Sequence, residues 1–325
     1  MTNSKLSVIS KPIKNELLQF SDIFKDSLKS KVPLVDLITR YIMKQKGKRI
    51  RPLLVLLSGK INGEVTERTF RGAVLVEMLH TATLVHDDVV DNSDKRRGFP
   101  SINAIWKNKV SVLMGDYLLS KGLLISVEGK DFDFLQTITH TVKRISEGEL
   151  LQIQKTKKLD IDEVTYFKII SDKTASLIGT CCEIGCLSTT ENAERISAMK
   201  KYGEYLGLAF QIRDDILDFE GVTKLFGKPI GGDIKEKKMT LPLIHALSNV
   251  DKSEANKVKK LIKADKKENV AKVIDFVKQN RGLEYAKERA TQIAENAKSE
   301  LKIFPDSPSK ESLINLVDFV LERNS

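Results

Sequence analysis

Two segments of this chain are apolar on nearly every side of a helix, and each leads into the same short acidic string. Phe70–Val90 contains Asp-Asp-Val-Val-Asp at 87–91, and Tyr202–Phe219 contains Asp-Asp-Ile-Leu-Asp at 214–218. A helix that is apolar all round is normally buried among other helices. Apolar residues recur at three- and four-residue spacing through most of the remaining chain, and β-type alternation is scarce. The sequence therefore predicts an all-α protein, a single large helical bundle around these two helices.

The helical pattern extends along the whole chain, and no low-complexity linker divides it. We therefore expect one domain over residues 1–325. Pro52 suits the first turn of a helix, and Asp-Ser-Pro at 306–308 suits a helix start. The expected helices lie near 12–29, 34–44, 50–60, 66–92, 109–128, 132–156, 161–187, 192–220, 238–248, 253–263, 267–279, 283–302 and 309–322.

The repeated Asp-Asp-x-x-Asp string indicates a cation site. Aspartate fills 22 of the 325 positions, so one such string is expected roughly 0.1 times by chance in this chain, and two far less often. Asp87 and Asp91 stand four residues apart and share a helix face, where two carboxylates repel each other. The C-terminal end of a helix adds the negative end of its dipole. Mg²⁺, which prefers carboxylate and phosphate oxygens, would relieve this repulsion, and two such faces could clamp a diphosphate.

Basic residues surround both acidic strings. Arg96 and Arg97 follow the first string, and Lys48 and Arg51 precede it in Gly-Lys-Arg-Ile-Arg-Pro. After the second string, the loop 221–238 contains four glycines and five lysines and could close over bound phosphates. Arg binds phosphate oxygens through paired hydrogen bonds, and Lys binds them as a point charge. The pattern indicates a diphosphate substrate.

Six motifs make the chain resemble the trans-polyprenyl diphosphate synthases, and most closely the medium- and long-chain, octaprenyl-type enzymes. In order, they are GKRIRP, HTATLVHDDVVDNSDKRRG, GDYLLSKGL, DKTASL, FQIRDDILD and FGKPIGGDIKEKKMTLPL. The resemblance implies a helical bundle of the isoprenoid synthase type with a central active-site cavity. It also implies a transferase of prenyl groups that uses isopentenyl diphosphate and an allylic diphosphate.

The resemblance also implies roles for the motif residues. Three Mg²⁺ ions are implied, two held by Asp87 and Asp91 and one by Asp214. The implied catalytic set is Asp87, Asp88, Asp91, Asp214, Asp215, Lys173 and Thr174. The implied ligands of the allylic diphosphate are Arg96, Lys173, Thr174, Gln211 and Lys228, and those of isopentenyl diphosphate are Lys48, Arg51, His80 and Arg97.

These roles imply a 1'-4 head-to-tail condensation. Metal ions and cationic side chains neutralise the leaving diphosphate, so the allylic C–O bond ionises to a carbocation. The double bond of isopentenyl diphosphate then attacks the cation, and a proton is lost to the departing diphosphate. No dedicated side-chain base is needed, so His80 is interpreted as a residue that holds the substrate.

Residues one turn before Asp87 indicate the length of the product. Ala82 and Thr83 are both small, whereas an aromatic side chain commonly blocks one of these positions in relatives that stop at farnesyl or geranylgeranyl. We expect the prenyl tail to pass beyond them toward Met78 and Leu79. One isoprene unit is comparable to a helical turn of about 5.4 Å. The expected product is hexaprenyl to octaprenyl diphosphate, for a quinone side chain.

Three alternatives remain open at the level of the sequence. The chain could be a geranylgeranyl or farnesyl diphosphate synthase, or a head-to-head coupling enzyme, although the latter would not need Lys48, Arg51 and Arg97. It could also be a non-catalytic subunit of a heteromeric prenyltransferase, although such subunits typically have degraded aspartate motifs.

Composition and charge indicate where the protein is located and which kinds of partner it can bind. The formal net charge is +10, but the lysines of 252–273 alternate with acids along a solvated helix face, and no nucleic-acid module accompanies them. No stretch approaches twenty uncharged apolar residues and no signal-type segment begins the chain, so we expect a cytoplasmic protein. Cys181, Cys182 and Cys186 read as packed free thiols. The resemblance implies a homodimer, and product release could involve peripheral membrane contact.

Overall fold

The computed structural model describes residues 2–45, 47, 49–96, 98–156, 159–220, 231–264 and 266–323, and most of this part of the chain is helical. Strands within these ranges are limited to a two-residue ladder, in which Lys95–Arg96 (β1) pairs antiparallel with Phe99–Pro100 (β2). The ladder closes the turn that follows the first acidic string. The expected all-α fold is confirmed.

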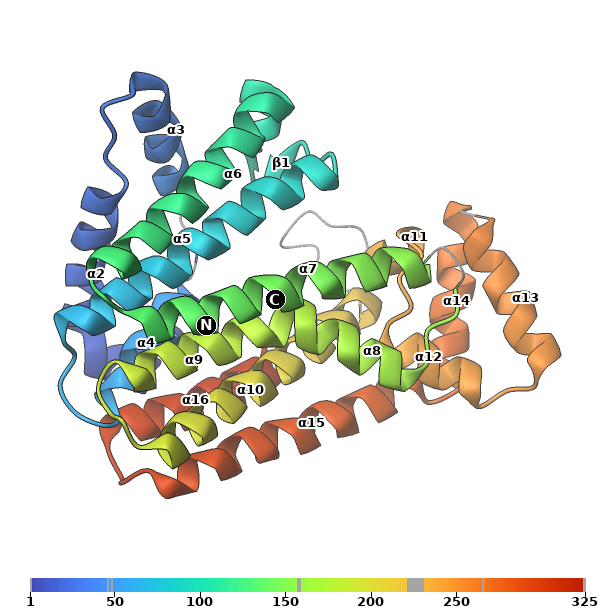
Figure 1. The fold of residues 1–325 in the computed structure, drawn as a ribbon. Helices are drawn as coiled ribbons and strands as arrows, with labels where there is room; N and C mark the ends of the chain where they lie inside the picture. The colour runs from blue at the N-terminus through green and yellow to red at the C-terminus, as the bar shows by residue number, and fades with distance from the viewer. Residues whose placement is uncertain are drawn as a thin grey trace.

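The two apolar segments form the long helices α5 (Glu67–Val90) and α10 (Ala193–Glu220) (Figure 1). Helix α5 starts with a capping box, because the Thr66 hydroxyl accepts from the Thr69 backbone N–H and the Thr69 hydroxyl accepts from that of Thr66. Helix α5 ends at Val90, within its acidic string, and α10 ends at Glu220, just after its string. Both motifs therefore lie at the C-terminal ends of core helices.

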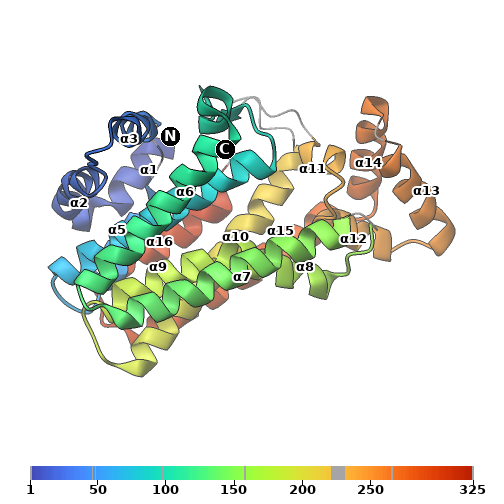
Figure 2. The same cartoon turned by 45° about the horizontal axis from the view of Figure 1, so that its top comes forward.

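The other long helices surround these two. Helix α6 packs along α5, α9 and α15 pack along α10, and α4 and α7 pack against α9 (Figures 1 and 2). Their bounds are Ile50–Lys60 (α4), Ile102–Glu128 (α6), Phe132–Thr156 (α7), Ser176–Leu187 (α9) and Gly282–Glu300 (α15).

Shorter elements cover the outside and the two ends of the bundle. Helix α1 packs on α16, α2 packs on α4 and α5, and α12 packs between α14 and α15. The bounds are Thr2–Ile9 (α1), Lys11–Ile13 (η1), Lys14–Ser27 (α2), Pro33–Lys44 (α3), Glu163–Ile170 (α8), Gly232–Lys235 (α11), Leu241–Ser248 (α12), Lys252–Lys263 (α13), Lys267–Gln279 (α14), Leu301–Ile303 (η4) and Pro308–Glu322 (α16).

The structure departs from the predicted elements at four places. The helix expected over 161–187 is three pieces, because a π-helical turn, η2 (Ser171–Ala175), separates α8 from α9. Helix α6 begins at Ile102 rather than at 109, but it is interrupted at Lys107, whose φ of 69° and ψ of 168° are not helical, so the expected start marks the segment after this kink. Helices α1 and α11 were not expected. The three cysteines are buried free thiols on α9, as expected.

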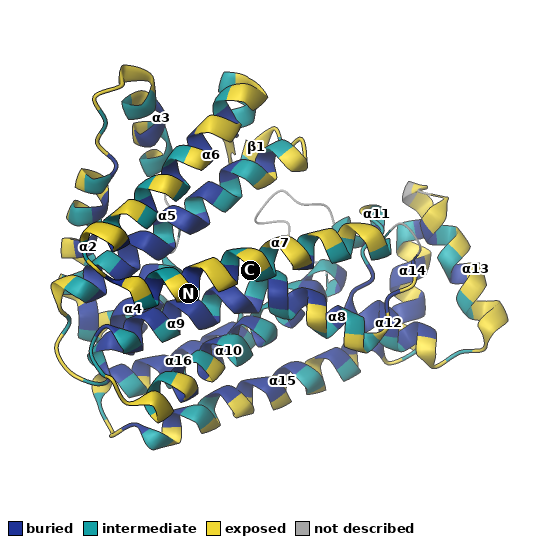
Figure 3. Cartoon of the chain, in the orientation of Figure 1, coloured by how far each residue is buried: buried dark blue, intermediate teal, exposed yellow. Residues whose placement is uncertain are grey.

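Helix α6 has one buried side and one exposed side (Figure 3). Its inner residues face α5, whereas Val112, Leu113, Leu124 and Val127 are exposed to solvent by 41 to 59%. By length and composition this helix could cross a membrane, which the sequence had not suggested, but the core helix of a soluble protein meets the same criterion. What matters for the site is that α6 fixes one side of α5.

Candidate active site

The first acidic motif is joined to the β1–β2 hairpin by an ion pair. Asp88 is only 2% exposed, and its Oδ1 accepts from Nε and Nη2 of Arg96, both at 2.7 Å. Burial raises the pKa of Asp88, although the Arg96 guanidinium opposes this shift. Asp87 and Asp91 are exposed on either side of this pair. The hairpin therefore holds Arg96 beside the end of α5.

Asp87 lies within electrostatic reach of the π turn. Partial burial of the carboxyl group and the neighbouring carboxylates of Glu149 and Asp91 raise the pKa of Asp87, while the charges of Lys173 and Arg96 act against that rise. Lys173 Nζ is fixed by two residues of α7, at 2.6 Å from Glu149 Oε2 and 2.9 Å from Gln152 Oε1.

The second motif reaches the same turn through a chain of hydrogen bonds. The Thr174 hydroxyl donates to Gln211 Oε1 at 2.9 Å, and Gln211 Nε2 donates to Asp215 Oδ1 at 2.9 Å. The Tyr166 hydroxyl donates to the other oxygen of Asp215 at 2.7 Å. Asp215 is 4% exposed, and burial together with the charge of Asp233 raises its pKa to about 8.

The other two aspartates of the second motif have different partners. Asp214 Oδ1 is 2.7 Å from Nη2 of Arg323, near the end of the chain, and this guanidinium lies 4.5 Å from the centre of the Phe210 ring. Asp218 accepts the backbone N–H groups of Gly232 and Asp233 at 3.0 and 3.1 Å. Asp218 thus anchors the backbone at Gly232 and Asp233. Residues 221–230 of the predicted closing loop, which include Lys228, lie outside the described residues.

Several of these groups line a cavity of about 140 Å³. Its polar lining comes from α7, α8, the π turn, the second motif region and the segment after the loop: Gln152, Thr156, Tyr166, Lys173, Thr174, Gln211, Asp215, Asp233, Lys238 and Thr240. Residues 87–91 of the first motif do not line it. Lys238 pairs there with Glu236. Four of the predicted residues, Lys173, Thr174, Gln211 and Asp215, are brought together in this cavity.

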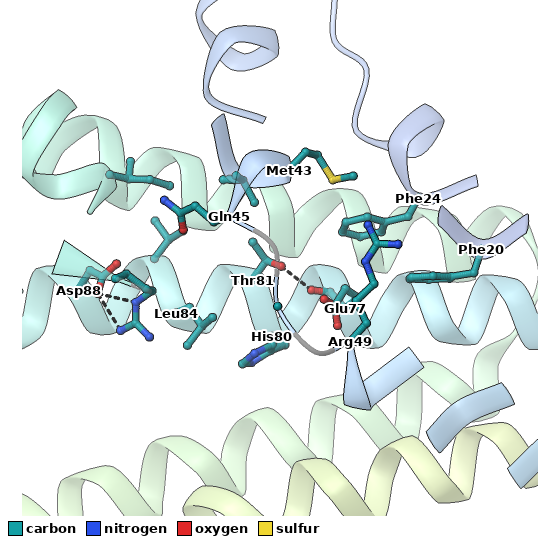
Figure 4. A pocket seen from close by; sticks show the side chains of 15 residues that line it. Phe20, Phe24, Met43, Gln45, Arg49, Glu77, His80, Thr81, Leu84 and Asp88 are labelled. Carbon is teal, nitrogen blue, oxygen red and sulfur yellow. Dashed lines mark hydrogen bonds and ion pairs between the residues drawn. The ribbon is translucent and has the colours of Figure 1, made fainter. Parts of the chain in front are cut away.

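A second pocket, of about 70 Å³, lies between α2, α3 and the outer side of α5 (Figure 4). Phe20 and Phe24 form its apolar wall, and Arg49, His80 and Arg96 are among its polar residues. It unites His80, expected at the isopentenyl diphosphate, with Arg96, expected at the allylic one.

The rest of the predicted isopentenyl set is placed less closely. Arg51 is half-buried in the first turn of α4 and does not line this pocket, and its charge acts on Cys181 of α9. Lys48 and Arg97 lie outside the described residues.

Ala82 and Thr83 lie on different sides of α5. Thr83 is one turn from Asp87 on the same face and is half exposed. Ala82 is 2% exposed and shares its face with His86, whose ring packs against Gly115 of α6. Only Thr83 therefore faces the same way as Asp87, because the rotation of about 100° per residue turns Ala82 toward α6.

The deeper expected residues, Met78 and Leu79, are buried. Met78 also packs toward α6, since a Cβ on Gly122 would lie 3.3 Å from its Cβ. Of the four proposed chain-length residues, Thr83 is therefore the most accessible from the motif.

Several residues of the site were missed by the sequence reasoning. They are Glu149, Gln152, Tyr166, Asp233 and Arg323. Glu149 and Gln152 share one face of a helix at i, i+3, which is a usable signal. Arg323 lies near the C-terminal end of the chain but contacts Asp214 of the second motif, so no local sequence pattern could have indicated it.

The donor set suits Mg²⁺. Across the described residues, no three His, Cys, Asp or Glu side chains are close enough to hold an ion alone. Mg²⁺ usually takes one or two carboxylates and completes its shell with water and substrate phosphate. The carboxylates of Glu149 and Asp91, which raise the pKa of Asp87, leave a local excess of negative charge that a cation would offset.

Comparisons with known proteins agree with this geometry. The family model described as Polyprenyl synthetase matches residues 32–279. The all-trans-nonaprenyl-diphosphate synthase (geranyl-diphosphate specific) of Rhodobacter capsulatus is 35% identical over 96% of both chains, and the octaprenyl diphosphate synthase of Haemophilus influenzae is 34% identical over 91% of both. The crystal structure of a Caulobacter crescentus polyprenyl synthase complexed with calcium and isoprenyl diphosphate has a TM-score of 0.90 at 31% identity and covers 98% of each chain.

Proposed function

The chain belongs to the polyprenyl synthetase family, and from this premise we propose that it condenses isopentenyl diphosphate with an allylic diphosphate, head to tail and with Mg²⁺. The product is a medium- or long-chain all-trans polyprenyl diphosphate, from hexaprenyl to octaprenyl, for a quinone side chain. In this proposal residues 1–325 form one polyprenyl synthase domain.

The observation that carries the proposal is the π turn between the two motifs. Lys173 acts electrostatically on Asp87 of the first motif. Its neighbour Thr174 is linked through Gln211 to Asp215 of the second. A diphosphate bound by Lys173 would therefore lie between two sets of carboxylates, which is the arrangement that metal-assisted departure of a diphosphate requires.

The cation sites follow from exposure and charge. Asp87, Asp91 and Asp214 reach solvent at the ends of their helices, so they are the residues we assign to Mg²⁺. Asp88 and Asp215 are buried and hydrogen-bonded, and we assign them to holding Arg96 and Gln211. Bound Mg²⁺ would supply the positive charge that makes the diphosphate a better leaving group. The crystallised Caulobacter relative, with its calcium and isoprenyl diphosphate, supports the same class of site.

The side chains of the protein then have distinct tasks. Lys173 and Arg96 donate to the diphosphate oxygens as the allylic C–O bond breaks. His80 and Arg96 line the pocket of Figure 4, where we place the diphosphate of isopentenyl diphosphate. The roles of Lys48, Arg51 and Arg97 as further ligands rest on the resemblance, because Arg51 does not line this pocket and the other two lie outside the described residues. The new C–C bond forms from the isopentenyl double bond, and the released diphosphate accepts the proton.

The test is product analysis with the purified full-length chain. We would incubate it with Mg²⁺, labelled isopentenyl diphosphate and geranyl, farnesyl or geranylgeranyl diphosphate, and determine the products by mass spectrometry. All-trans products of six to eight isoprene units are expected. Products ending at three or four units would instead identify a short-chain synthase. An inactive chain would support a non-catalytic subunit.

The exposed apolar side of α6 supports a homodimer. Leu113 and Leu124, exposed by 59 and 50%, belong to a row that a second copy would cover. Sedimentation should give twice the chain mass of 36.6 kDa, and a variant with both Leu113→Glu and Leu124→Glu should sediment as a monomer. A monomeric wild-type protein would contradict the homodimer.

We place the enzyme in the cytoplasm, with peripheral membrane contact during product release.

A further inference from the structure

The π turn η2 interrupts the α-helical run between α8 and α9, and it carries Lys173 and Thr174. A π turn has i→i+5 hydrogen bonds and one extra residue, and such turns occur frequently at functional sites. Because α-helical bonding is normally preferred, something outside the turn has to hold this geometry. Glycines on both sides and an ion cluster around the buried Asp172 are the candidates.

Two glycines let neighbouring helices close on the turn. A Cβ on Gly148 of α7 would lie 2.9 Å from Asp172 Cβ and 3.1 Å from the backbone nitrogen of Lys173. A Cβ on Gly207 of α10 would lie 2.6 Å from Ala175 Cα. The backbones of α7 and α10 therefore contact η2 directly and confine it.

An ion cluster ties the turn to the same two helices. Asp172 is 7% exposed; its Oδ1 accepts from Nε of Arg144 at 2.9 Å, and its Oδ2 accepts from Lys168 at 2.9 Å. Arg144, on α7, also donates to the Ser171 hydroxyl at 3.0 Å and to Glu204 of α10 at 2.6 Å. One guanidinium thus links α7, η2 and α10.

We propose that Asp172, bound by Arg144, is a positioning residue that holds the π turn so that Lys173 and Thr174 point to the allylic diphosphate. This rests on the proposed function. Asp172 directly precedes Lys173 and Thr174 in the sequence, but its carboxylate is bound by Arg144 and Lys168, so it acts through the backbone of the turn. Without its charge the turn can relax toward α-helical bonding, which rotates the residues that follow by about 100°.

The experiment compares Asp172→Asn with Asp131→Asn in the full-length protein. Asp131 is a matched control, since it is 3% exposed and is also bound by two cations, Arg68 and Arg71. It lies at the junction of α6 and α7 and outside the proposed site. Both variants lose a buried carboxylate charge, so both should lower the melting temperature.

Only Asp172→Asn should change substrate use. We expect kcat/KM for the allylic diphosphate to fall about 10- to 100-fold, because small displacements of positioning groups can cost that much. The KM for isopentenyl diphosphate should stay within twofold of wild type. Inorganic diphosphate with Mg²⁺, titrated calorimetrically, should bind about tenfold more weakly to Asp172→Asn and unchanged to Asp131→Asn. Asp172→Glu, which keeps the charge, should recover part of both losses.

Two further measurements keep the proposal open to failure. If Asp172→Asn does not fold, Ser171→Ala, which removes only the bond from Arg144, should shift the same allylic parameter in the same direction. Equal kinetic and diphosphate-binding behaviour of Asp172→Asn and Asp131→Asn would overturn the positioning role while leaving the proposed function intact. A wild-type chain without prenyl transfer would overturn the proposed function, and the diphosphate titration would still decide the role of Asp172.

Discussion

The two Asp-Asp-x-x-Asp motifs have the same pattern and both lie at the C-terminal end of a core helix. Their second aspartates nevertheless have different hydrogen-bond donors, a cation for Asp88 and neutral groups for Asp215. Asp88 accepts two hydrogen bonds from the Arg96 guanidinium. Asp215 accepts from a phenol and an amide, both neutral, and the charge of Asp233 acts on it unfavourably. Burial raises the pKa of both carboxyl groups, but only Asp88 has a cation beside it that opposes the rise. Identical motifs therefore need not share a protonation state.

The difference extends to the residues on either side. In the first motif Asp87 and Asp91 are exposed. In the second, Asp214 pairs with Arg323, and Asp218 accepts two backbone N–H groups from the chain that follows the loop. The first motif is thus open to ligands, whereas the second is integrated with the C-terminus and the base of the predicted closing loop.

The largest effect is expected from removing the first aspartate of either motif. Asp87→Ala and Asp214→Ala should each lower Mg²⁺-dependent condensation about a thousandfold, because each removes a carboxylate that faces developing charge through a cation. Circular dichroism should stay helical in both variants, since neither side chain belongs to the core. Steady-state turnover with saturating Mg²⁺ is the measurement. Near-normal turnover in one variant would show that only the other motif holds an essential ion.

A smaller effect, on the free energy of unfolding, should distinguish the second aspartates of the two motifs, Asp88 and Asp215. Asp88→Asn leaves the Arg96 guanidinium without its charged partner, so we expect a loss of about 1–3 kcal/mol of unfolding free energy and a weaker grip on substrate. Asp215→Asn keeps an oxygen for the Tyr166 hydroxyl, so it should cost less than about 1 kcal/mol. Urea unfolding of both variants tests this order, and equal losses would contradict the contrast between the motifs.

The sequence was sufficient for the parts of the site that local patterns specify. Apolar residues on every face marked α5 and α10 as central, and the acidic strings marked their ends. The π turn was not predictable, because the apolar spacing of 161–187 is continuous and the turn depends on Gly148, Gly207 and Asp172. The contact of Arg323 with Asp214 was not predictable either, because it joins distant parts of the chain.

The residue one turn before the first motif can be made aromatic, like its counterpart before the second motif, and the effect measured on product length. The first motif has Thr83 at this place, and the second has Phe210, whose ring lies under Arg323. Thr83→Phe should shorten the product by one or more isoprene units, since Thr83 shares the face of Asp87 and each unit spans about one helical turn of 5.4 Å. Mass spectrometry of the products measures the change.

Ala82→Phe provides the companion variant. It should also shorten the product, but Ala82 is buried on the side of α6, so the larger ring should cost about 1–3 kcal/mol of stability. If neither variant alters product length, the growing chain does not pass this turn.

The smallest expected effect is a pH dependence of stability between pH 6 and 8, which we expect chiefly from the second motif because its Asp215 has the larger pKa shift. The pKa of Asp215 is about 8 in the folded protein against an ordinary value of 3.8, so between these values the folded state keeps a proton that the unfolded state releases. Stability from this group is complete below pH 4 and is lost as the pH rises toward 8. With EDTA present, the melting temperature should fall by about a few degrees from pH 6 to 8 in wild type and in Asp88→Asn, and less in Asp215→Asn. A slope that persists unchanged in Asp215→Asn would assign the proton to another group, and the two motifs would then differ in their partners but not in their charge.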